Sequence, residues 1–188
     1  MNHKQPKLLF LMFLFCLLPG FTHAEQIYEL SKKSQITFTA HITGGSFVTK
    51  AKKIEGLITL SDNGSQIIHA EIIVPVQNLD SGISLRNSHM HEKYLEASHH
   101  PDIIFEIKDP IDFSTSPFTA KGAFKIKGIT KQEAMEFSWK NVSDQKIEIE
   151  SEFPMIITDY GIPQPGFAVV KMDPKIDVRV SLILELKK

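Results

Sequence analysis

The stretch Gly122–Trp139, GAFKIKGITKQEAMEFSW, decides the fold class of this chain. Apolar and polar residues alternate in it from Phe124 to Lys127, and they alternate again from Met135 to Trp139. Successive side chains of a β-strand point to opposite faces, so each half of the stretch has one apolar and one polar face. Gly128 readily adopts turn conformations. The stretch therefore predicts a β-hairpin with one face buried and the other in water.

The same two-residue period recurs through most of the chain, which predicts an antiparallel sheet that is covered on one side. Roughly eight such strands can bury their apolar faces in a closed or nearly closed barrel, or in a two-sheet sandwich. The alternation is compatible with both. The other apolar rows are Ile36, Phe38, Ala40 and Ile42; Ile68, Ala70, Ile72, Val74 and Val76; Ile103, Phe105 and Ile107; Ile147, Ile149, Phe153 and Met155; and Val178, Val180, Leu182, Leu184 and Leu186.

The connections between these rows contain one short helix and two segments rich in turn residues. The helix is expected from about Leu85 to Ala97, inside a long connection between two strands. Residues 62–65, DNGS, predict a turn. Residues 160–167, YGIPQPGF, contain too much proline and glycine for a strand and predict a loop or a lid.

Residues 1–24 have the features of a secretory signal peptide. Lys4 and Lys7 precede an unbroken apolar run over residues 8–18, and Ala24 ends a small-residue segment suited to cleavage. The run is too short to span a bilayer, which takes about 20 apolar residues, so we expect no membrane anchor after cleavage. The remaining residues, 25–188, contain no cysteine, because the single one is Cys16. We therefore expect one secreted domain that its apolar core stabilises without disulfides.

The charge and the polar motifs argue against two broad functions. A formal net charge of −1 gives no global attraction to nucleic acid. No serine stands in a Gly-x-Ser-x-Gly elbow, which disfavours a hydrolase. Asp159 beside Tyr160 fits a turn better than an acid–base pair. We expect neither a nucleic-acid partner nor an enzyme.

Four histidines crowd around the predicted helix, at His89, His91, His99 and His100. On a helix the first two point about 200° apart and cannot share a metal ion, whereas in an extended segment they could. We favour solvated or helix-capping histidines over a metal site. A third interpretation is a ligand contact, because imidazole can hydrogen-bond a quinone carbonyl or, when protonated, a pyrophosphate.

Arg86 lies in the same connection and offers two parallel N–H donors. Such a guanidinium suits a phosphate or a carboxylate of a ligand. It could equally pair with Asp80 or Asp102 and fasten the helix to the sheet. We favour this structural pairing.

Several short motifs stand in a recognisable order along the chain. Residues 86–87 (RN), 89–90 (HM), 94–95 (YL) and 100–105 (HPDIIF) come first, then 122–131 (GAFKIKGITK) and 158–162 (TDYGI). Together they resemble the motifs of the YceI-like family of periplasmic polyisoprenoid-binding proteins. The chain departs from the family pattern at Asn87, usually aspartate, at His100, usually tyrosine, and at Ile42, where a histidine often stands.

The resemblance implies an extended, antiparallel, eight-stranded, lipocalin-like barrel with one short helix in a long connection, located in the periplasm. Its apolar tunnel would hold a polyisoprenoid, a quinone-like lipid or a similar long-chain amphiphile, with no other cofactor. The residues alone favour a filled core, and the resemblance reverses that. The tail-binding residues would be Ile36, Phe38, Ala40, Val74, Phe105, Phe124, Ile126, Phe137, Trp139, Phe153 and Val180, with Phe47 and Phe167 closing the ends; the headgroup would lie near Arg86, Asn87, His89, Tyr94 and His100.

Two other functions stay open beside lipid binding. A stress-related periplasmic module without lipid could dock a protein partner on the acidic row Glu148, Glu150 and Glu152, although a solvated strand face is the simpler interpretation. A metal-binding protein would use the four histidines. A homodimer is compatible with every one of these functions.

Overall fold

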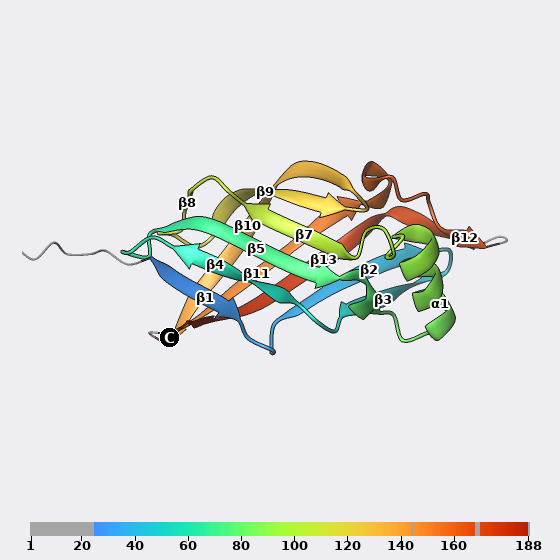
Figure 1. Cartoon of the computed structure of the whole chain (residues 1–188). Helices are drawn as coiled ribbons and strands as arrows, with labels where there is room; N and C mark the ends of the chain where they lie inside the picture. Colours follow the sequence, from blue (N-terminus) through green and yellow to red (C-terminus); the bar gives the residue numbers. More distant parts are fainter. Residues whose placement is uncertain (1–24, 144, 168–169, 188) are drawn as a thin grey trace, which may run out of the picture.

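Antiparallel strands close into an eight-stranded barrel in the computed structural model of the protein (Figure 1). The structure describes residues 25–143, 145–167 and 170–187, and of Phe167 only the backbone. The predicted signal peptide, residues 1–24, lies outside the described residues. The strands are β1 (Gln26–Leu30), β2 (Gln35–Ile42), β3 (Gly45–Ala51), β4 (Glu55–Leu60), β5 (Gln66–Pro75), β6 (Leu79–Asp80), β7 (Asp102–Ile107), β8 (Ile111–Asp112), β9 (Phe118–Ile126), β10 (Ile129–Ser143), β11 (Lys146–Ile156), β12 (Gly166–Phe167) and β13 (Val170–Leu186).

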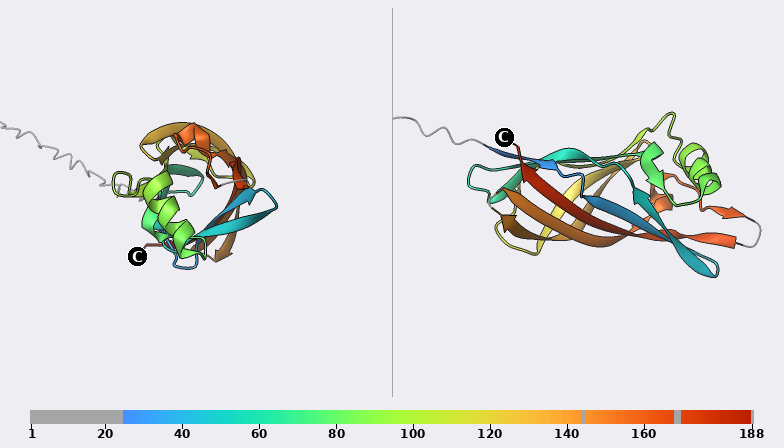
Figure 2. Two further views of the ribbon diagram at one scale, coloured as in Figure 1. Left: turned by 90° about the vertical axis from the view of Figure 1, so that its right-hand side faces the viewer. Right: turned by 90° about the horizontal axis from the view of Figure 1, so that it is seen from below.

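The ring has eight positions because two of its strands are interrupted. β1 and β2 both pair with β13 and together fill one position. β4 pairs with β1 and β3 pairs with β2, so β3 and β4 together fill the next position. The ring continues β4–β5–β7–β9–β10–β11–β13 and closes where β13 pairs with β1. Viewed along the axis, the ribbon forms a ring (Figure 2). The closure confirms the barrel and excludes the two-sheet sandwich.

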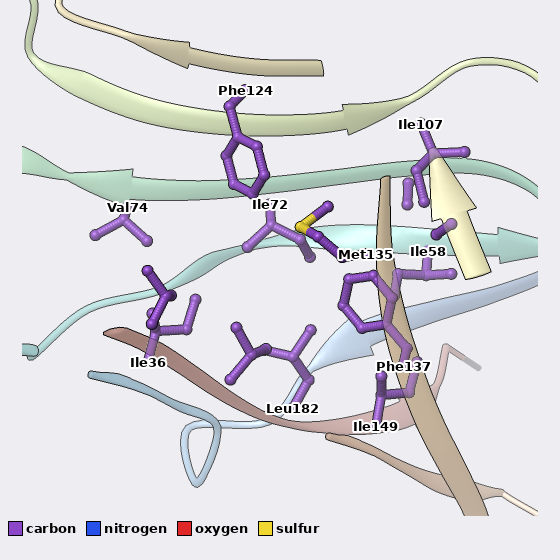
Figure 3. Close-up of a cluster of buried hydrophobic side chains, with 14 of the residues drawn as sticks. Ile36, Ile58, Ile72, Val74, Ile107, Phe124, Met135, Phe137, Ile149 and Leu182 are labelled. Carbon is purple, nitrogen blue, oxygen red and sulfur yellow. The ribbon is translucent and has the colours of Figure 1, made fainter. Parts of the chain in front are cut away.

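The predicted apolar rows meet inside this ring. In Figure 3, Ile36, Ile72, Phe124, Phe137 and Leu182 extend from five different strands toward a shared interior, and all five are buried. Burying one such side chain contributes about 1.5–3 kcal/mol. The two-residue period therefore produces a continuous apolar lining, with the polar faces outward.

One inward row is shifted by a β-bulge at the start of β5. Thr59 pairs with His69, but the next residue, Leu60, pairs with Ile67, so Ile68 is the extra residue. Ile67 is accordingly buried and Ile68 only half-buried. The prediction that Ile68 begins the inward row was wrong, because a bulge moves the two-residue period by one position.

The predicted hairpin joins β9 to β10 through two residues, Lys127 and Gly128. Both have positive φ, 49° and 76°, and Ile126 pairs directly with Ile129. Two successive positive φ values are typical of the type I′ turn, whose twist matches that of the two strands. The structure thus confirms the hairpin predicted from Gly128.

A helical segment lies across one end of the barrel (Figure 2). It consists of α1 (Ser84–Ser88) and a π-helical continuation, η2 (His89–Tyr94). The predicted helix is confirmed, although it ends at Tyr94 and not at Ala97. Two 3-10 turns, η1 (Val76–Asn78) and η3 (Ile157–Tyr160), complete the described elements. None of these described helices is long and apolar enough to cross a bilayer.

Tyr160 is buried, and its hydroxyl has no hydrogen-bond partner among the described residues. Burial, helped by Glu133 and Asp159, raises the pKa of Tyr160 to about 12. Because this pKa lies above the ordinary value of 10.0, the stability linked to the neutral phenol is complete below pH 10 and is lost as the pH rises toward 12.

We therefore expect Tyr160→Phe to raise the free energy of unfolding at pH 7 by about 1 kcal/mol, because it removes an unsatisfied buried hydroxyl. The variant should also lose less stability than the wild type between pH 10 and pH 12. Urea denaturation at neutral and alkaline pH measures both effects. If the wild type and the variant lost the same free energy of unfolding between pH 10 and pH 12, the assignment of this loss to Tyr160 would be contradicted.

Candidate functional site

An apolar cavity of about 630 Å³ occupies the barrel interior. Ligand pockets typically measure about 300–1,000 Å³. Three alanines that point inward, Ala40, Ala70 and Ala120, are buried and line this space. In an eight-stranded barrel, large side chains just fill the interior, so small residues at inward positions leave part of it empty. The filled core that the residues alone favoured is therefore wrong.

The cavity contains almost all of the predicted tail-binding side chains. They come from strands all around the ring, so apolar side chains would surround a ligand inside the cavity. The predicted residues in the lining are Ile36, Phe38, Ala40, Phe47, Val74, Phe105, Phe124, Ile126, Phe137, Phe153 and Val180. The Phe167 side chain lies outside the described part of the structure.

Trp139 does not line the cavity. Its ring stacks on Phe113 with centroids 4.9 Å apart, and its Nε1 donates to the Thr115 carbonyl at 2.9 Å. It lines a separate, smaller hollow at the far end of the barrel. Inward alternation placed Trp139 on the correct face of β10, but the Phe113 ring lies between it and the cavity lining at Phe118.

The mouth of the cavity lies under α1 and η2, where the lining becomes polar. Arg86, His89, Lys93 and Tyr94 belong to the lining there. Arg86 and Lys93 are the only charged residues in the described lining, and it contains no carboxylate. The cavity thus combines an apolar interior with a basic mouth.

Arg86 is held in place without an ion pair among the described residues. Its Nε donates to Ser81 Oγ at 2.8 Å and its Nη2 to the Ser81 carbonyl at 2.7 Å. The guanidinium carbon lies 3.8 Å from the centre of the Phe47 ring. The predicted pairing with Asp80 or Asp102 is wrong, because the guanidinium is bonded to Ser81 and Asp80 is bonded to Lys52. The charge of Arg86 is therefore not neutralised within the described structure.

Asn87 fastens α1 to the barrel and does not face the cavity. Its Oδ1 accepts from the backbone N–H and the hydroxyl of Ser81 at 2.8 and 2.6 Å, and its Nδ2 donates to Asp80 at 2.7 Å. Hydrogen bonds from Lys52 and Asn87 hold the pKa of Asp80 well below its usual range. Because the side-chain amide of Asn87 makes these bonds, Asn87 lies outside the headgroup region in which the resemblance placed it.

His100 also lies away from the described cavity lining. Its ring packs on the β9–β10 turn, where a Cβ added at Gly128 would come within 2.8 Å of His100 Cε1. Glu96, near the end of the same connection, pairs with Lys127 of this turn at 2.8 Å. Both contacts attach the connection to the hairpin.

The other histidines have separate environments. His91 Nε2 donates to the Leu79 carbonyl at 2.8 Å, and His99 Nδ1 shares a hydrogen bond with the Ser98 hydroxyl. His89 lies at the mouth. In the described part of the chain, no three His, Cys, Asp or Glu side chains gather in a way that could hold a metal ion. The described structure therefore does not bring the four histidines together at one point.

Sequence reasoning missed several mouth residues, notably Leu85, Met90 and Lys93. Arg86, Met90 and Lys93 follow one another at helical spacings of four and three, which places them on one face of a helix. That spacing could have identified them once Arg86 had been singled out. The lining residues Ile83, Pro165 and Val170 come from irregular connections or strand ends, and no periodicity marks them.

The acidic row on β11 is partly neutralised by its neighbours. Glu148 lies 2.8 Å from Lys140 and Glu152 lies 2.9 Å from Arg179. Exposed pairs of this kind contribute little stability, but they reduce the charge that a basic partner would meet. The geometry agrees with the simpler interpretation, a solvated strand face.

A closed antiparallel barrel whose apolar cavity opens at a basic mouth defines a lipocalin-like ligand-binding barrel. The chain belongs to the YceI-like family, since the model of the YceI-like domain matches residues 28–184. No curated protein matches it.

Solved structures of low sequence identity share the fold. A polyisoprenoid-binding domain from Saccharophagus degradans, implicated in plant cell wall breakdown, is 13% identical with a TM-score of 0.70, over 86% of this chain and 98% of that one. BcnA of Burkholderia cenocepacia is 12% identical with a TM-score of 0.70, over 82% and 98%. The YceI protein of Campylobacter jejuni is 13% identical with a TM-score of 0.63, over 74% and 84%.

Proposed function

We propose that this protein binds a long-chain amphiphile in the periplasm, a polyisoprenoid or a similar lipid such as a quinone, and carries or stores it. The supporting observation is the cavity itself, which has an apolar interior and, in its described lining, two cations that both lie at one end. The tail would lie inside and the head at the mouth. Each buried methylene contributes about 0.8 kcal/mol, so affinity comes mainly from the tail.

The length of the cavity indicates the length of the tail. On β13 the lining extends from Met172 to Leu182. With a rise of about 3.3 Å per residue and a strand tilt of about 40°, this corresponds to about 25 Å along the axis. An extended hydrocarbon chain advances about 1.3 Å per carbon–carbon bond. The cavity therefore suits about 20 main-chain carbons, or about five isoprene units.

The headgroup is expected to be anionic or rich in hydrogen-bond acceptors. Arg86 and Lys93 are donors without an acceptor function, and no carboxylate in the described lining would repel an anion. A phosphate, pyrophosphate or carboxylate fits this mouth, and a quinone carbonyl could accept a bond from His89. Arg86, stacked on Phe47, is already oriented, which reduces the entropy lost on binding.

Arg86→Gln should weaken the binding of an anionic amphiphile about tenfold or more, since hydrogen bonds to charged groups contribute about 1.5–3 kcal/mol. The affinity for the fatty alcohol of the same chain length should stay within about threefold. Titrating both ligands measures the difference. Lys125→Gln is the matched control, because it removes one cation from the outer face of β9. Equal losses for the acid and the alcohol would contradict a headgroup role.

This function needs no catalytic residue, and the described lining contains no carboxylate that could act as an acid or base. We propose accordingly that the protein is not an enzyme. The homodimer stays a prediction that size-exclusion chromatography with light scattering can test.

Organic extraction of protein purified from the periplasmic fraction, followed by mass spectrometry, tests the proposal. We expect one amphiphile per barrel, with a tail of about 20 main-chain carbons. Protein that contains no lipid and does not bind a fluorescent fatty acid would contradict lipid binding. A stoichiometric protein partner in the same preparation, without lipid, would favour the interaction module.

A further inference from the structure

Two stacked aromatic rings close the end of the barrel opposite the mouth. We call Phe113 and Trp139 the plug. Phe113, in the connection between β8 and β9, is 2% exposed and stacks on Trp139 of β10 at 4.9 Å between ring centroids. On its other side it meets Phe118 edge to face, at 5.3 Å and 85°. Phe118 belongs to the cavity lining, so Phe113 is in contact with the wall at the deep end.

Hydrogen bonds hold this connection against the barrel. The backbone N–H of Phe113 donates to the Ser65 carbonyl at 2.7 Å. The backbone N–H of Trp139 donates to Ser116 Oγ at 2.8 Å, and its indole N–H donates to the Thr115 carbonyl at 2.9 Å. The plug is therefore a fixed part of the wall.

The plug lies between two hollows whose described linings have no residue in common. On one side lies the apolar cavity, with Phe118 and Phe137 in its wall. On the other lies a hollow of about 560 Å³ lined by Phe113 and Trp139 together with polar side chains such as Asn63 and Asn141. The first hollow would take a tail, and the second lies directly beyond the Phe113 ring.

We propose that Phe113 sets the maximum length of tail that the cavity accepts, an inference that rests on the proposed function. A tail entering from the mouth runs along the apolar wall until it reaches Phe118, and beyond this point it meets the Phe113 ring that packs on Phe118. Further carbons cannot pass a close-packed ring, so they stay outside at the mouth and gain no burial. The affinity should therefore rise with chain length only until the tail reaches the plug.

Unbranched fatty acids of increasing length are the probes, with affinities measured by displacement of a fluorescent fatty acid. In the wild type, each added carbon should strengthen binding about fourfold until about 20 carbons, and longer chains should gain nothing. In Phe113→Ala the limit should move upward by about four to six carbons, because a six-carbon ring is removed and the second hollow becomes continuous with the cavity.

Two further variants make the test independent of how well Phe113→Ala folds. Ala120 is fully buried and lines the cavity close to Phe118, so Ala120→Leu should move the limit downward. Phe38→Ala makes the same chemical change as Phe113→Ala at a wall position away from the plug. It should weaken all chain lengths alike and leave the limit unchanged.

A limit that stays at the wild-type length in both Phe113→Ala and Ala120→Leu would overturn the role of the plug while leaving lipid binding intact. A limit that moves equally in Phe38→Ala would overturn it as well. A wild-type protein that binds no fatty acid of any length would overturn this inference together with the proposed function.

Discussion

Replacing Ala40 with phenylalanine is expected to abolish the binding of long-chain amphiphiles. Ala40 lies on β2 with its side chain in the cavity, paired with Ile176 on one side and with Phe47 on the other. Phe47 lies beneath Arg86, so this position is close to the mouth. A benzyl group here would obstruct the path of the tail into the deeper part. Losing the burial of even six methylenes removes about 5 kcal/mol, which weakens binding more than 1,000-fold.

The variant should remain folded, because the new ring enters a space that the native side chains leave empty. Circular dichroism and urea denaturation check this, and titration with a fluorescent fatty acid measures binding. Thr39→Phe, at the neighbouring position whose side chain points away from the cavity, is the matched control and should bind as the wild type does. Unchanged affinity in a folded Ala40→Phe protein would show that the tail lies elsewhere.

The largest effect on stability is expected from Gly56→Ala in β4. Gly56 has a φ of +145°, a value that side-chain-bearing residues rarely adopt. An added Cβ would lie 2.0 Å from the Glu71 carbonyl oxygen of β5, which is far inside contact distance. β4 is paired on both sides, with β1 and with β5, so it cannot move away without breaking a ladder. We expect the free energy of unfolding to fall by about 3 kcal/mol or more.

Gly45→Ala is the matched control for this change. Gly45 begins β3, and a Cβ there would meet no atom within 4 Å. Its substitution should alter the free energy of unfolding by no more than about 0.5 kcal/mol. Denaturation of both variants in urea gives the comparison. Similar losses in the two would mean that the approach of Gly56 to β5 is not what requires glycine.

The barrel could largely be predicted from the sequence because its main signal is local. The alternation that places Phe124 and Ile126 on one face of β9, and Met135 and Phe137 on one face of β10, follows from the geometry of each single strand. The β9–β10 turn is equally local, since Lys127 and Gly128 alone carry the two positive φ values. The bulge at Ile68 escaped prediction because it depends on how β5 pairs with β4.

The candidate site shows the opposite case. Arg86 was expected to pair with an acid, but the tertiary structure bonds Asp80 to Lys52 and Asn87 and leaves Arg86 on Ser81 and Phe47. The choice among several partners within reach depends on the direction of α1. That direction is set by the bonds of Asn87 to Asp80 and Ser81 and by the contact of Arg86 with Phe47 on β3, a strand distant in the chain.

Apart from the bulge at Ile68, the sequence by itself determined which strand side chains of this protein face inward, because successive side chains along a regular strand alternate between its two faces. Only the tertiary structure decided that the inward faces leave a cavity and where that cavity ends. Both depend on distances across the barrel. The centroids of the Phe113 and Trp139 rings lie 4.9 Å apart. The small residues Ala40 and Ala120 lie on different strands, and no local sequence pattern gives the distance between those strands.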